Sequence, residues 1–290
     1  MSQSRSTVVT AMILMIIGMC SLPFGDVFAK LATEQSSYNG PALAFLRFSA
    51  GIIIIFPICM MMGGFSNLKA SFWKAQFLRG CLVALIVSCI ITAVSLIPLA
   101  ETFAAFFVGP IIATILSALL LSEKVRRIEW FAVMFGFVGV LIVVQPVNSL
   151  EPGILWAIAA GVFYGCFLTA TRWARDTGPP LSQNLAQFIF ASLLLSPFVL
   201  PEISISDLSV PSLLLGSGVF STLGNLLSII ALGMARAAKL APLVYFQLPA
   251  ATLYGWLFFD SLPQTTTIAG MLVIIVAGFL PVLQSEKKQA

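Results

Sequence analysis

Four ionisable residues stand inside or at the edges of strongly apolar segments: Asp26, Lys30, Arg47 and Glu101. A charge inside a bilayer is expensive, so an ionisable side chain in a membrane span is a functional candidate by default. Asp26 and Lys30 are four residues apart, which places both side chains on one face of a helix, where they can pair. Arg47 falls at a similar depth in the next apolar run, and Glu101 opens a later run at the same outer end. We therefore expect one polar cluster in the outer half of the protein.

Such a cluster can bind a small charged molecule. A substrate carboxylate would meet Arg47 or Lys30, and a substrate amine or a coupled proton would meet Asp26. A static network that locks neighbouring helices together, with Lys30 extending toward water, is the alternative for the same residues. The chain contains no histidine, so proton coupling would need a carboxylate, and Asp26 is the first candidate.

Neutral polar and aromatic side chains within the apolar runs can line a central cavity, because amides and hydroxyls find no partner in hydrocarbon. Asn225 is favoured because apolar residues surround its amide. Phe24 and Tyr164 can stack on a planar or cationic ligand, although ordinary packing is the alternative for every aromatic residue in a chain with 24 phenylalanines. The cavity candidates are Tyr164, Thr169, Asn184, Gln187, Asn225, Tyr245 and Gln247.

Prolines inside apolar runs remove a helix hydrogen bond and can kink a helix. We expect Pro23, Pro110 and Pro249 to serve as pivots for helices that bend or rock. Arg172 lies near the inner end of an apolar run and is a candidate gating residue. Anchoring of that end in the cytoplasm by its positive charge is the alternative.

The elements that carry these groups are about ten apolar runs, each long enough to cross a bilayer as a helix. The chain is 59% hydrophobic and 9% charged, with a mean hydropathy of +1.04, whereas about a quarter of the residues of a soluble domain are charged. This composition predicts an all-α membrane protein with one membrane domain. The predicted spans are residues 7–30, 41–62, 77–98, 101–121, 129–146, 153–174, 183–200, 211–232, 241–259 and 266–284.

The distribution of basic residues predicts the orientation of these spans. With the N-terminus placed in the cytoplasm, all but two of the 15 lysines and arginines fall on the cytoplasmic side, and the exceptions are Lys30 and Arg47. The asymmetry predicts that both termini are cytoplasmic. A cleaved signal peptide is the alternative for the first run, because Val27-Phe28-Ala29 resembles a cleavage site.

The two halves of the chain share a pattern. Ala113-Thr114 lines up with Ala251-Thr252, each after a proline in an apolar run, and a similar register pairs Lys30 with Arg172. About five spans per half is an odd number, so the second half would enter the membrane in the opposite sense. The sequence therefore predicts a 5+5 inverted-topology repeat, and chance similarity among apolar runs is the alternative.

At these residues the chain resembles the drug/metabolite transporter superfamily, in its EamA group of ten-span carriers. The clearest stretch is 110–146, with Pro110, the Ser122-Glu123 pair that closes the fourth span, and Gly136 and Gly139 in the fifth. The resemblance implies two EamA-like five-helix repeats, at residues 1–146 and 147–290.

A subgroup of metabolite carriers in this superfamily has an aspartate and a lysine in the first span and an arginine in the second. Asp26, Lys30 and Arg47 match that pattern. The second half departs from the family, because Asp260-Ser261 stands where a Gly-Glu pair is usual.

We expect a secondary transporter of the bacterial inner membrane that moves a small polar or zwitterionic metabolite by alternating access. The resemblance implies an amino acid, a vitamin or a nucleotide-derived compound as the substrate class. An efflux carrier for lipophilic cations or drugs is the alternative, and it predicts that the basic residues are only structural. The absence of a P-loop motif argues against ATP-driven transport by this chain.

An intramembrane enzyme would need a nucleophile–base pair or a metal cluster, and the sequence offers no histidine for either. We expect a protein that is not an enzyme, with no cofactor and no metal. The expected partners are the substrate and the lipid bilayer, and nucleic acid is not among them. A functional monomer is the expected state, and a dimer is the alternative.

Overall fold

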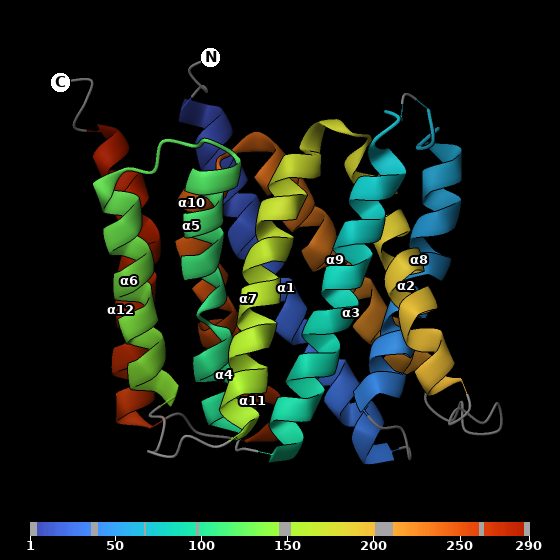
Figure 1. The fold of residues 1–290 in the computed structure, drawn as a ribbon. Coiled ribbons are helices and arrows are strands. Elements are labelled where there is room, and N and C mark those ends of the chain that lie inside the picture. Colours follow the sequence, from blue (N-terminus) through green and yellow to red (C-terminus); the bar gives the residue numbers. More distant parts are fainter. Residues whose placement is uncertain are drawn as a thin grey trace.

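The computed structural model describes residues 5–35, 40–66, 68–96, 99–144, 152–200, 211–260 and 264–286. These residues form a bundle of helices that run side by side, with no strand among them (Figure 1). The first turn of α1 and the last turn of α12 lie at the same end of the bundle (Figure 1). This end is called the inner end below, and the opposite end is called the outer end.

The helices follow the predicted apolar runs closely. Their bounds are α1 Arg5–Gln35, α2 Gly40–Met61, α3 Phe72–Leu96, α4 Leu99–Phe106, α5 Gly109–Leu120, α6 Arg127–Val144, α7 Pro152–Trp173, the 3-10 helix η1 Ala174–Asp176, α8 Pro180–Val199, α9 Pro211–Met234, α10 Ala237–Leu240, the 3-10 helix η3 Ala241–Phe246, α11 Gln247–Phe259 and α12 Thr265–Glu286.

Two of the predicted spans are not continuous helices, which corrects the sequence expectation. Span 101–121 is divided into α4 and α5, and Pro110 falls in the first turn of α5. Span 241–259 is divided into the 3-10 helix η3 and α11, with Pro249 in the first turn of α11. A proline lacks a backbone donor and restricts the preceding residue, so a new helix starts more easily at this position than an old one continues. Pro23, by contrast, lies inside α1 without ending it.

Length and composition qualify five of the described helices to cross a membrane by themselves. They lie within α1, α2, α3, α7 and α9, and the helices at 109–120 and 265–280 are apolar but shorter. Large apolar side chains such as Ile53, Phe198 and Leu272 face outward and are 68%, 77% and 60% exposed. An apolar outer surface on an apolar helical bundle is the pattern of a membrane protein.

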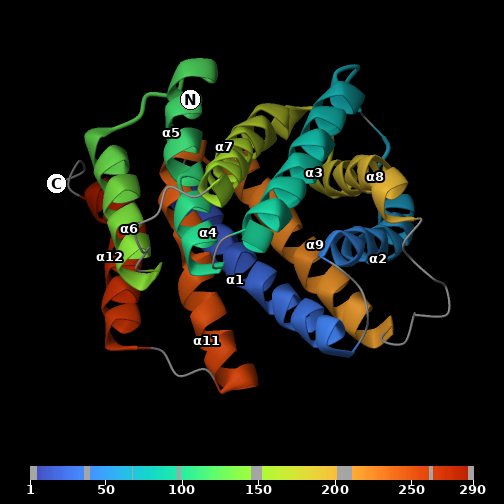
Figure 2. The same cartoon turned by 60° about the horizontal axis from the view of Figure 1, so that its bottom comes forward.

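Helices from the two halves of the chain pack against each other. The most extensive contacts join α1 to α9, α3 to α7, α6 to α12 and α2 to α8, and Figure 2 shows these pairs across the bundle. Glycines permit the close approach: a Cβ at Gly139 of α6 would lie 3.0 Å from the carbonyl oxygen of Gly270 in α12. Small residues at helix crossings are the usual means of close packing in membranes.

Candidate functional site

The first and second helices contribute an ion pair to the outer half of the bundle. Nη2 of Arg47 in α2 lies 2.6 Å from Oδ1 of Asp26 in α1, and Nε of Arg47 donates to Oγ of Ser217 in α9 at 2.9 Å. The side chains of Asp26 and Arg47 are 61% and 22% exposed. The structure therefore brings together two of the four predicted charged residues across α1, α2 and α9.

Glycines let the three helices meet at the level of this ion pair. A Cβ at Gly25 of α1 would lie 3.0 Å from Oγ of Ser221 in α9, and a Cβ at Gly218 of α9 would lie 3.2 Å from the carbonyl oxygen of Arg47. α9 therefore packs closely against both α1 and α2 at the level of the ion pair.

Lys30 stands near the outer end of the same face of α1 and is exposed. Its Nζ lies 3.8 Å from the centroid of the Phe259 ring at the end of α11. A cation above a ring face is attracted by the quadrupole of the ring. The fourth predicted residue, Glu101, falls in α4, but its side chain lies outside the described residues.

Phe24 lies in a group of aromatic rings beside the charged residues. Its ring contacts Phe28 of α1, Phe220 of α9, and Tyr254 and Phe258 of α11, at centroid distances between 4.4 and 5.8 Å. These contacts are mostly edge-on or tilted, the geometry that aromatic pairs prefer. The group forms an apolar, polarisable surface where α1, α9 and α11 meet.

Two of the predicted polar candidates meet in the centre of the bundle. Nε2 of Gln247, at the start of α11, lies 3.3 Å from the hydroxyl oxygen of Tyr164 in α7 and 3.3 Å from the sulfur of Met19 in α1. Met19, Asp26 and Lys30 are spaced by seven and four residues, so they lie on nearly one face of α1. Met19 is about 10 Å along the helix axis from Asp26.

Four other candidates lie in buried or half-buried positions. Tyr245 and Gln187 are fully buried, and neither the hydroxyl of Tyr245 nor the amide of Gln187 has a hydrogen-bond partner among the described residues. The amide of Asn184 donates to the carbonyl oxygen of Thr222 at 3.0 Å. The half-buried Asn225 donates to the backbone of its own helix, at Ser221. The structure thus divides the predicted cavity residues among several places and does not gather them in one.

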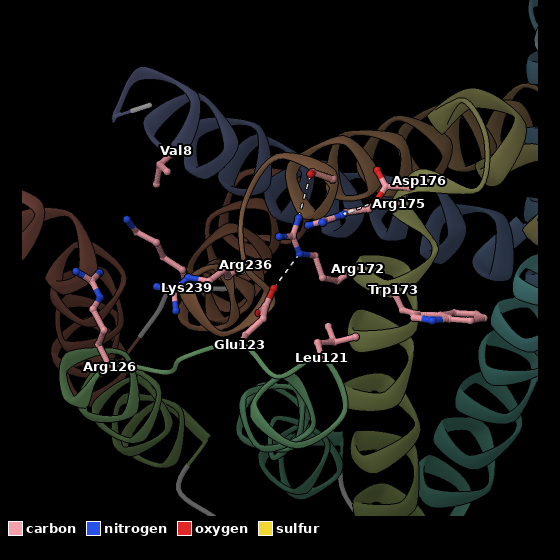
Figure 3. A pocket seen from close by; sticks show the side chains of 11 residues that line it. Val8, Leu121, Glu123, Arg126, Arg172, Trp173, Arg175, Asp176, Arg236 and Lys239 are labelled. Atoms are coloured by element: carbon pink, nitrogen blue, oxygen red, sulfur yellow. Dashed lines mark hydrogen bonds and ion pairs between the residues drawn. The ribbon is translucent and has the colours of Figure 1, made fainter. Parts of the chain in front are cut away.

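Arg172 belongs to a buried cluster at the inner end. Its Nε lies 3.0 Å from Oε1 of Glu123, at side-chain exposures of 5% and 10%. Its Nη1 donates to the carbonyl oxygens of Leu232 and Gly233 at the end of α9, at 2.8 and 3.0 Å. Figure 3 shows this guanidinium between Glu123 and the end of α9. One side chain of α7 therefore joins the α5 end of the first half to α9 of the second.

A second carboxylate strengthens this inner cluster. Glu129, at the start of α6, is fully buried and pairs with both Arg126 and Arg236. Glu123 also accepts a hydrogen bond from the backbone N–H of Ala237 at 3.1 Å. The two glutamates together hold the ends of α5, α6, α7 and α9 and the start of α10 in contact.

Sequence reasoning placed Arg79 among the charges of the cytoplasmic side, but the structure buries it completely. Its Nε donates to Thr171 of α7 at 3.1 Å, and its Nη1 donates to Gln76 and Gln183 at 2.5 and 3.4 Å. The guanidinium also lies 5.5 Å from the ring centroid of Phe167. Among the described residues it has no carboxylate partner, so neutral oxygens and one ring share its charge.

Sequence reasoning also missed Met19 and Glu129 as site residues. Met19 could have been found from its helical spacing with Asp26, which puts both on one face. Glu129 follows the basic residues Lys124, Arg126 and Arg127 closely in the sequence, and this proximity was a usable signal. No local signal marks the partners of Arg79, which come from α7 and α8.

The fold and these groups define a helical membrane protein with ionic side chains inside its apolar helices. A model of the EamA-like transporter family matches residues 9–145 and, a second time, residues 151–283. The chain belongs to the EamA-like transporter family, within the drug/metabolite transporter superfamily that its sequence resembles.

Characterised relatives cover nearly the whole chain. A riboflavin transporter of Vibrio cholerae is 24% identical over 90% of this chain and 89% of its own. An S-adenosylmethionine uptake transporter of Rickettsia prowazekii is 23% identical over 99% of this chain and 97% of its own. A pseudopaline exporter of Pseudomonas aeruginosa is 25% identical over 89% of this chain and 92% of its own.

Another protein, of known crystal structure, has the same fold. It superimposes with a TM-score of 0.75, covering 99% of this chain and 100% of that chain, at 18% sequence identity. The expectation of a transporter from this family is confirmed by the family match and by the relatives, which include both importers and exporters by name.

Proposed function

We propose that this protein is a secondary transporter of the bacterial inner membrane that moves a small polar or zwitterionic metabolite by alternating access. In this proposal the chain crosses the membrane about ten times as two inverted five-helix repeats, with the inner end of the bundle in the cytoplasm. The substrate binds along the face of α1 that carries Met19, Asp26 and Lys30.

The helix contacts support the inverted repeat. If the two halves correspond, α1 is equivalent to α7 and α3 is equivalent to α9. The contact of α1 with α9 is then equivalent to the contact of α7 with α3, while the contacts of α2 with α8 and α6 with α12 map onto themselves. A two-fold relation between the halves predicts this arrangement, and the family model likewise matches each half once.

The observation that carries the proposal is the change of exposure along one face of α1. Met15 and Met19 are each 1% exposed, whereas Asp26 on the same face is 61% exposed and Lys30 is exposed as well. An exposed charge within an apolar helix would be costly if it faced lipid. We therefore assign this exposed surface to the wall of a water-filled pathway that opens at the outer end and closes near Met19.

The inner end supports the same conformation. Arg172 and Glu123, with Glu129 and Arg236, hold the helix ends of both halves together there. A pathway that is open outside and closed inside is one of the two states that alternating access requires. Opening of the inner end then needs the separation of α7 from the end of α9, and the breaks before α5 and α11 provide the pivots.

The charges at the outer pathway suit a substrate with groups of both signs. The guanidinium of Arg47 has five N–H donors, and its described contacts with Asp26 and Ser217 use two of them. A substrate carboxylate can take the remaining donors, and a substrate amine or a coupled proton can take Asp26. The relatives named for riboflavin, S-adenosylmethionine and pseudopaline support a metabolite as the cargo.

The group of aromatic rings favours a second candidate, an efflux carrier for lipophilic cations. Phe24 packs against Phe220 and Tyr254, and the same helix carries the carboxylate of Asp26 two residues later; aromatic rings and a carboxylate both attract cations. In that case Asp26 and the rings would bind the cargo, and Arg47 would only neutralise Asp26 in the empty protein.

Counterflow in proteoliposomes separates the two candidates. We would measure uptake of labelled amino acids, vitamins, nucleoside-like metabolites and lipophilic cations by the wild-type protein, Arg47→Ala and the control Arg127→Ala, which changes an exposed arginine at the inner end. The proposal predicts uptake of an anionic or zwitterionic metabolite that falls about tenfold or more in Arg47→Ala and persists in Arg127→Ala. Uptake confined to lipophilic cations and unaffected in Arg47→Ala would contradict it.

A further inference from the structure

A pocket separate from the outer charged cluster lies at the inner end of the bundle. Its volume is about 1030 Å³, which is in the size range of small-molecule sites. We call it the inner basic pocket. Its lining residues are Val8, Leu121, Glu123, Arg126, Arg172, Trp173, Arg175, Asp176, Gly233, Arg236 and Lys239.

Positive charge dominates this lining. Five of the lining residues are arginine or lysine, whereas two are acidic, and Figure 3 shows Arg172 and Arg175 on one side of the pocket and Arg126, Arg236 and Lys239 on the other. Arg172 and Arg175 have carboxylate partners within the lining, Glu123 and Asp176. Of the other three cations, Arg126 and Arg236 pair with the carboxylate of Glu129, whose charge also acts on Lys239 from outside ion-pair distance.

Two of these three cations are incompletely satisfied. Lys239 in α10 is only 8% exposed and has no ion-pair partner among the described residues. Nη2 of Arg126 is buried and has no hydrogen-bond acceptor among them. Burial, followed by the neighbouring charge of Arg126, lowers the pKa of Lys239, and Arg236 acts in the same direction against the attraction of Glu129. Buried cations that repel one another around an open volume are stabilised by an anion.

We propose that the inner basic pocket is a binding site for a phosphate group. A phosphate carries up to two charges and several acceptor oxygens, so it can bond with a guanidinium and an ammonium group at once. It would lie beside the ammonium group of Lys239 and the guanidinium groups of Arg126 and Arg236, which line the pocket. Val8, Leu121 and Trp173 give the lining an apolar portion that can contact the organic part of a phosphate ester.

The bound phosphate has a structural consequence. Lys239 belongs to α10, and Arg126 lies in the connection between α5 and α6. A phosphate that contacts both joins the same helix ends that Glu123 and Glu129 join. Binding at this pocket therefore stabilises the closed inner end, and it acts as a regulator distinct from the substrate at Asp26 and Arg47.

The bound phosphate group can belong to a soluble ester or to the headgroup of an anionic lipid. Basic pockets on the cytoplasmic side of membrane proteins bind such headgroups. The inner basic pocket is a feature of the inner end alone, and the binding of a ligand to it can be measured without any transport. Failure of this proposal therefore leaves the proposed transport function untouched, and the converse also holds.

The first test is ligand binding by the full-length protein in a neutral detergent. We would follow the melting temperature with increasing pyrophosphate or inorganic phosphate, against sodium chloride at matched ionic strength. The proposal predicts a saturable stabilisation by pyrophosphate that chloride does not reproduce. Equal effects of pyrophosphate and chloride would overturn it, because they would reflect only ionic screening.

Single-residue variants test whether pyrophosphate binds at Lys239. Lys239→Gln should weaken pyrophosphate binding about tenfold or more, whereas Lys239→Arg, which keeps the charge, should bind within about twofold of wild type. Lys74→Gln is the matched control, because Lys74 is exposed on α3 at the same end of the bundle and outside the pocket. Undiminished binding by Lys239→Gln would contradict the assignment.

A measurement on the wild-type protein keeps the test independent of whether a variant folds. Acetylation of Lys239 by a soluble reagent, followed by peptide mass spectrometry, should be slowed by pyrophosphate while acetylation of Lys74 is unchanged. In nanodiscs, protection by phosphatidylglycerol and not by phosphatidylcholine identifies a lipid source, and protection by pyrophosphate in both identifies a soluble source. Absence of protection by every phosphate compound would overturn the proposal.

Discussion

At the scale of single residues, the chain uses guanidinium groups in three different ways. Arg47 is partly buried and keeps donors available beside Asp26. Arg172 is buried and uses its donors to join helix ends, and Arg79 is buried among neutral oxygens. The rigid fork of arginine explains why one residue type fills all three positions. Only the surroundings of each arginine, which come from distant parts of the chain, distinguish the three positions.

The buried ion pair of Arg172 gives a testable difference in stability. Arg172→Gln leaves the carboxylate of Glu123 without its cation, so we expect a loss of about 3 kcal/mol in the free energy of unfolding. The matched control is Arg175→Gln, whose partner Asp176 is 69% exposed, and whose loss should be at most about 0.5 kcal/mol. Unfolding of the detergent-solubilised variants, followed by circular dichroism, makes the comparison. Equal stability of the two variants would show that the inner cluster does not hold the helices together.

Sequence reasoning at this scale identified the charged residues but not all of their partners. Asp26 and Arg47 were predicted to lie in one cluster, and they form a direct ion pair. Asp26 and Lys30 were expected to be able to pair through their helical spacing, but the described partner of Asp26 comes from α2, and Lys30 lies over Phe259 of α11. Helical spacing tells which residues share a face, whereas the neighbour of that face depends on packing that a single sequence does not reveal.

At the scale of helices, close contacts depend on glycine at defined positions. A Cβ at Gly139 of α6 would lie 2.8 Å from Ile274 and 3.0 Å from the backbone of Gly270 in α12, whereas a Cβ at Gly255 of α11 would meet nothing within 4 Å. Replacement of glycine by alanine is therefore expected to affect the stability of the protein differently at the two positions.

We expect Gly139→Ala to destabilise the protein by about 1–3 kcal/mol, because α12 must move away from α6. We expect Gly255→Ala to be neutral or to stabilise by up to about 1 kcal/mol, because alanine is the better helix former. Melting temperatures of the two purified variants in the same detergent test this difference. A similar destabilisation by both substitutions would mean that loss of glycine flexibility, and not helix packing, sets the cost.

The helix breaks were only partly predictable. The sequence placed Pro110 and Pro249 in equivalent positions, and each falls in the first turn of a new helix. Their neighbours are as apolar as the rest of the runs, so hydropathy gave no sign that the helices would be divided. Pro23 has the same residue type inside an equally apolar run, yet α1 continues through it. Tertiary contacts decide whether a proline bends a membrane helix or divides it.

At the scale of the whole molecule, the account requires a pathway that is open at the outer end. In a cysteine-free background, Lys30→Cys should react with a membrane-impermeant maleimide added outside intact cells. Ile53→Cys is the control: Ile53 is 68% exposed in the bundle, but we place it against lipid, where a thiol does not ionise and stays unreactive. Equal labelling of both positions, or of neither, would contradict a water-filled pathway along α1.

Architecture was the most predictable level, because an apolar helix in a membrane must satisfy its own backbone hydrogen bonds. The helical class, the approximate bounds of the helices and the family all follow from hydropathy and a few motifs. The contacts between α1 and α9 or between α3 and α7 join residues far apart in sequence. These contacts create the buried partners of Arg79 and Arg172, which is why the inner cluster was the least predictable part.

The central claim is that the pair of Asp26 and Arg47 binds the substrate and does not merely lock α1 to α2. Exchange of the two charges in Asp26→Arg with Arg47→Asp tests it most directly, with counterflow and melting temperature measured for each single variant and for the exchanged pair. We expect the exchange to restore the melting temperature lost in the single variants, while transport stays about tenfold or more below wild type. Recovery of transport to the wild-type rate in the exchanged pair would contradict the claim and would make the ion pair a structural lock.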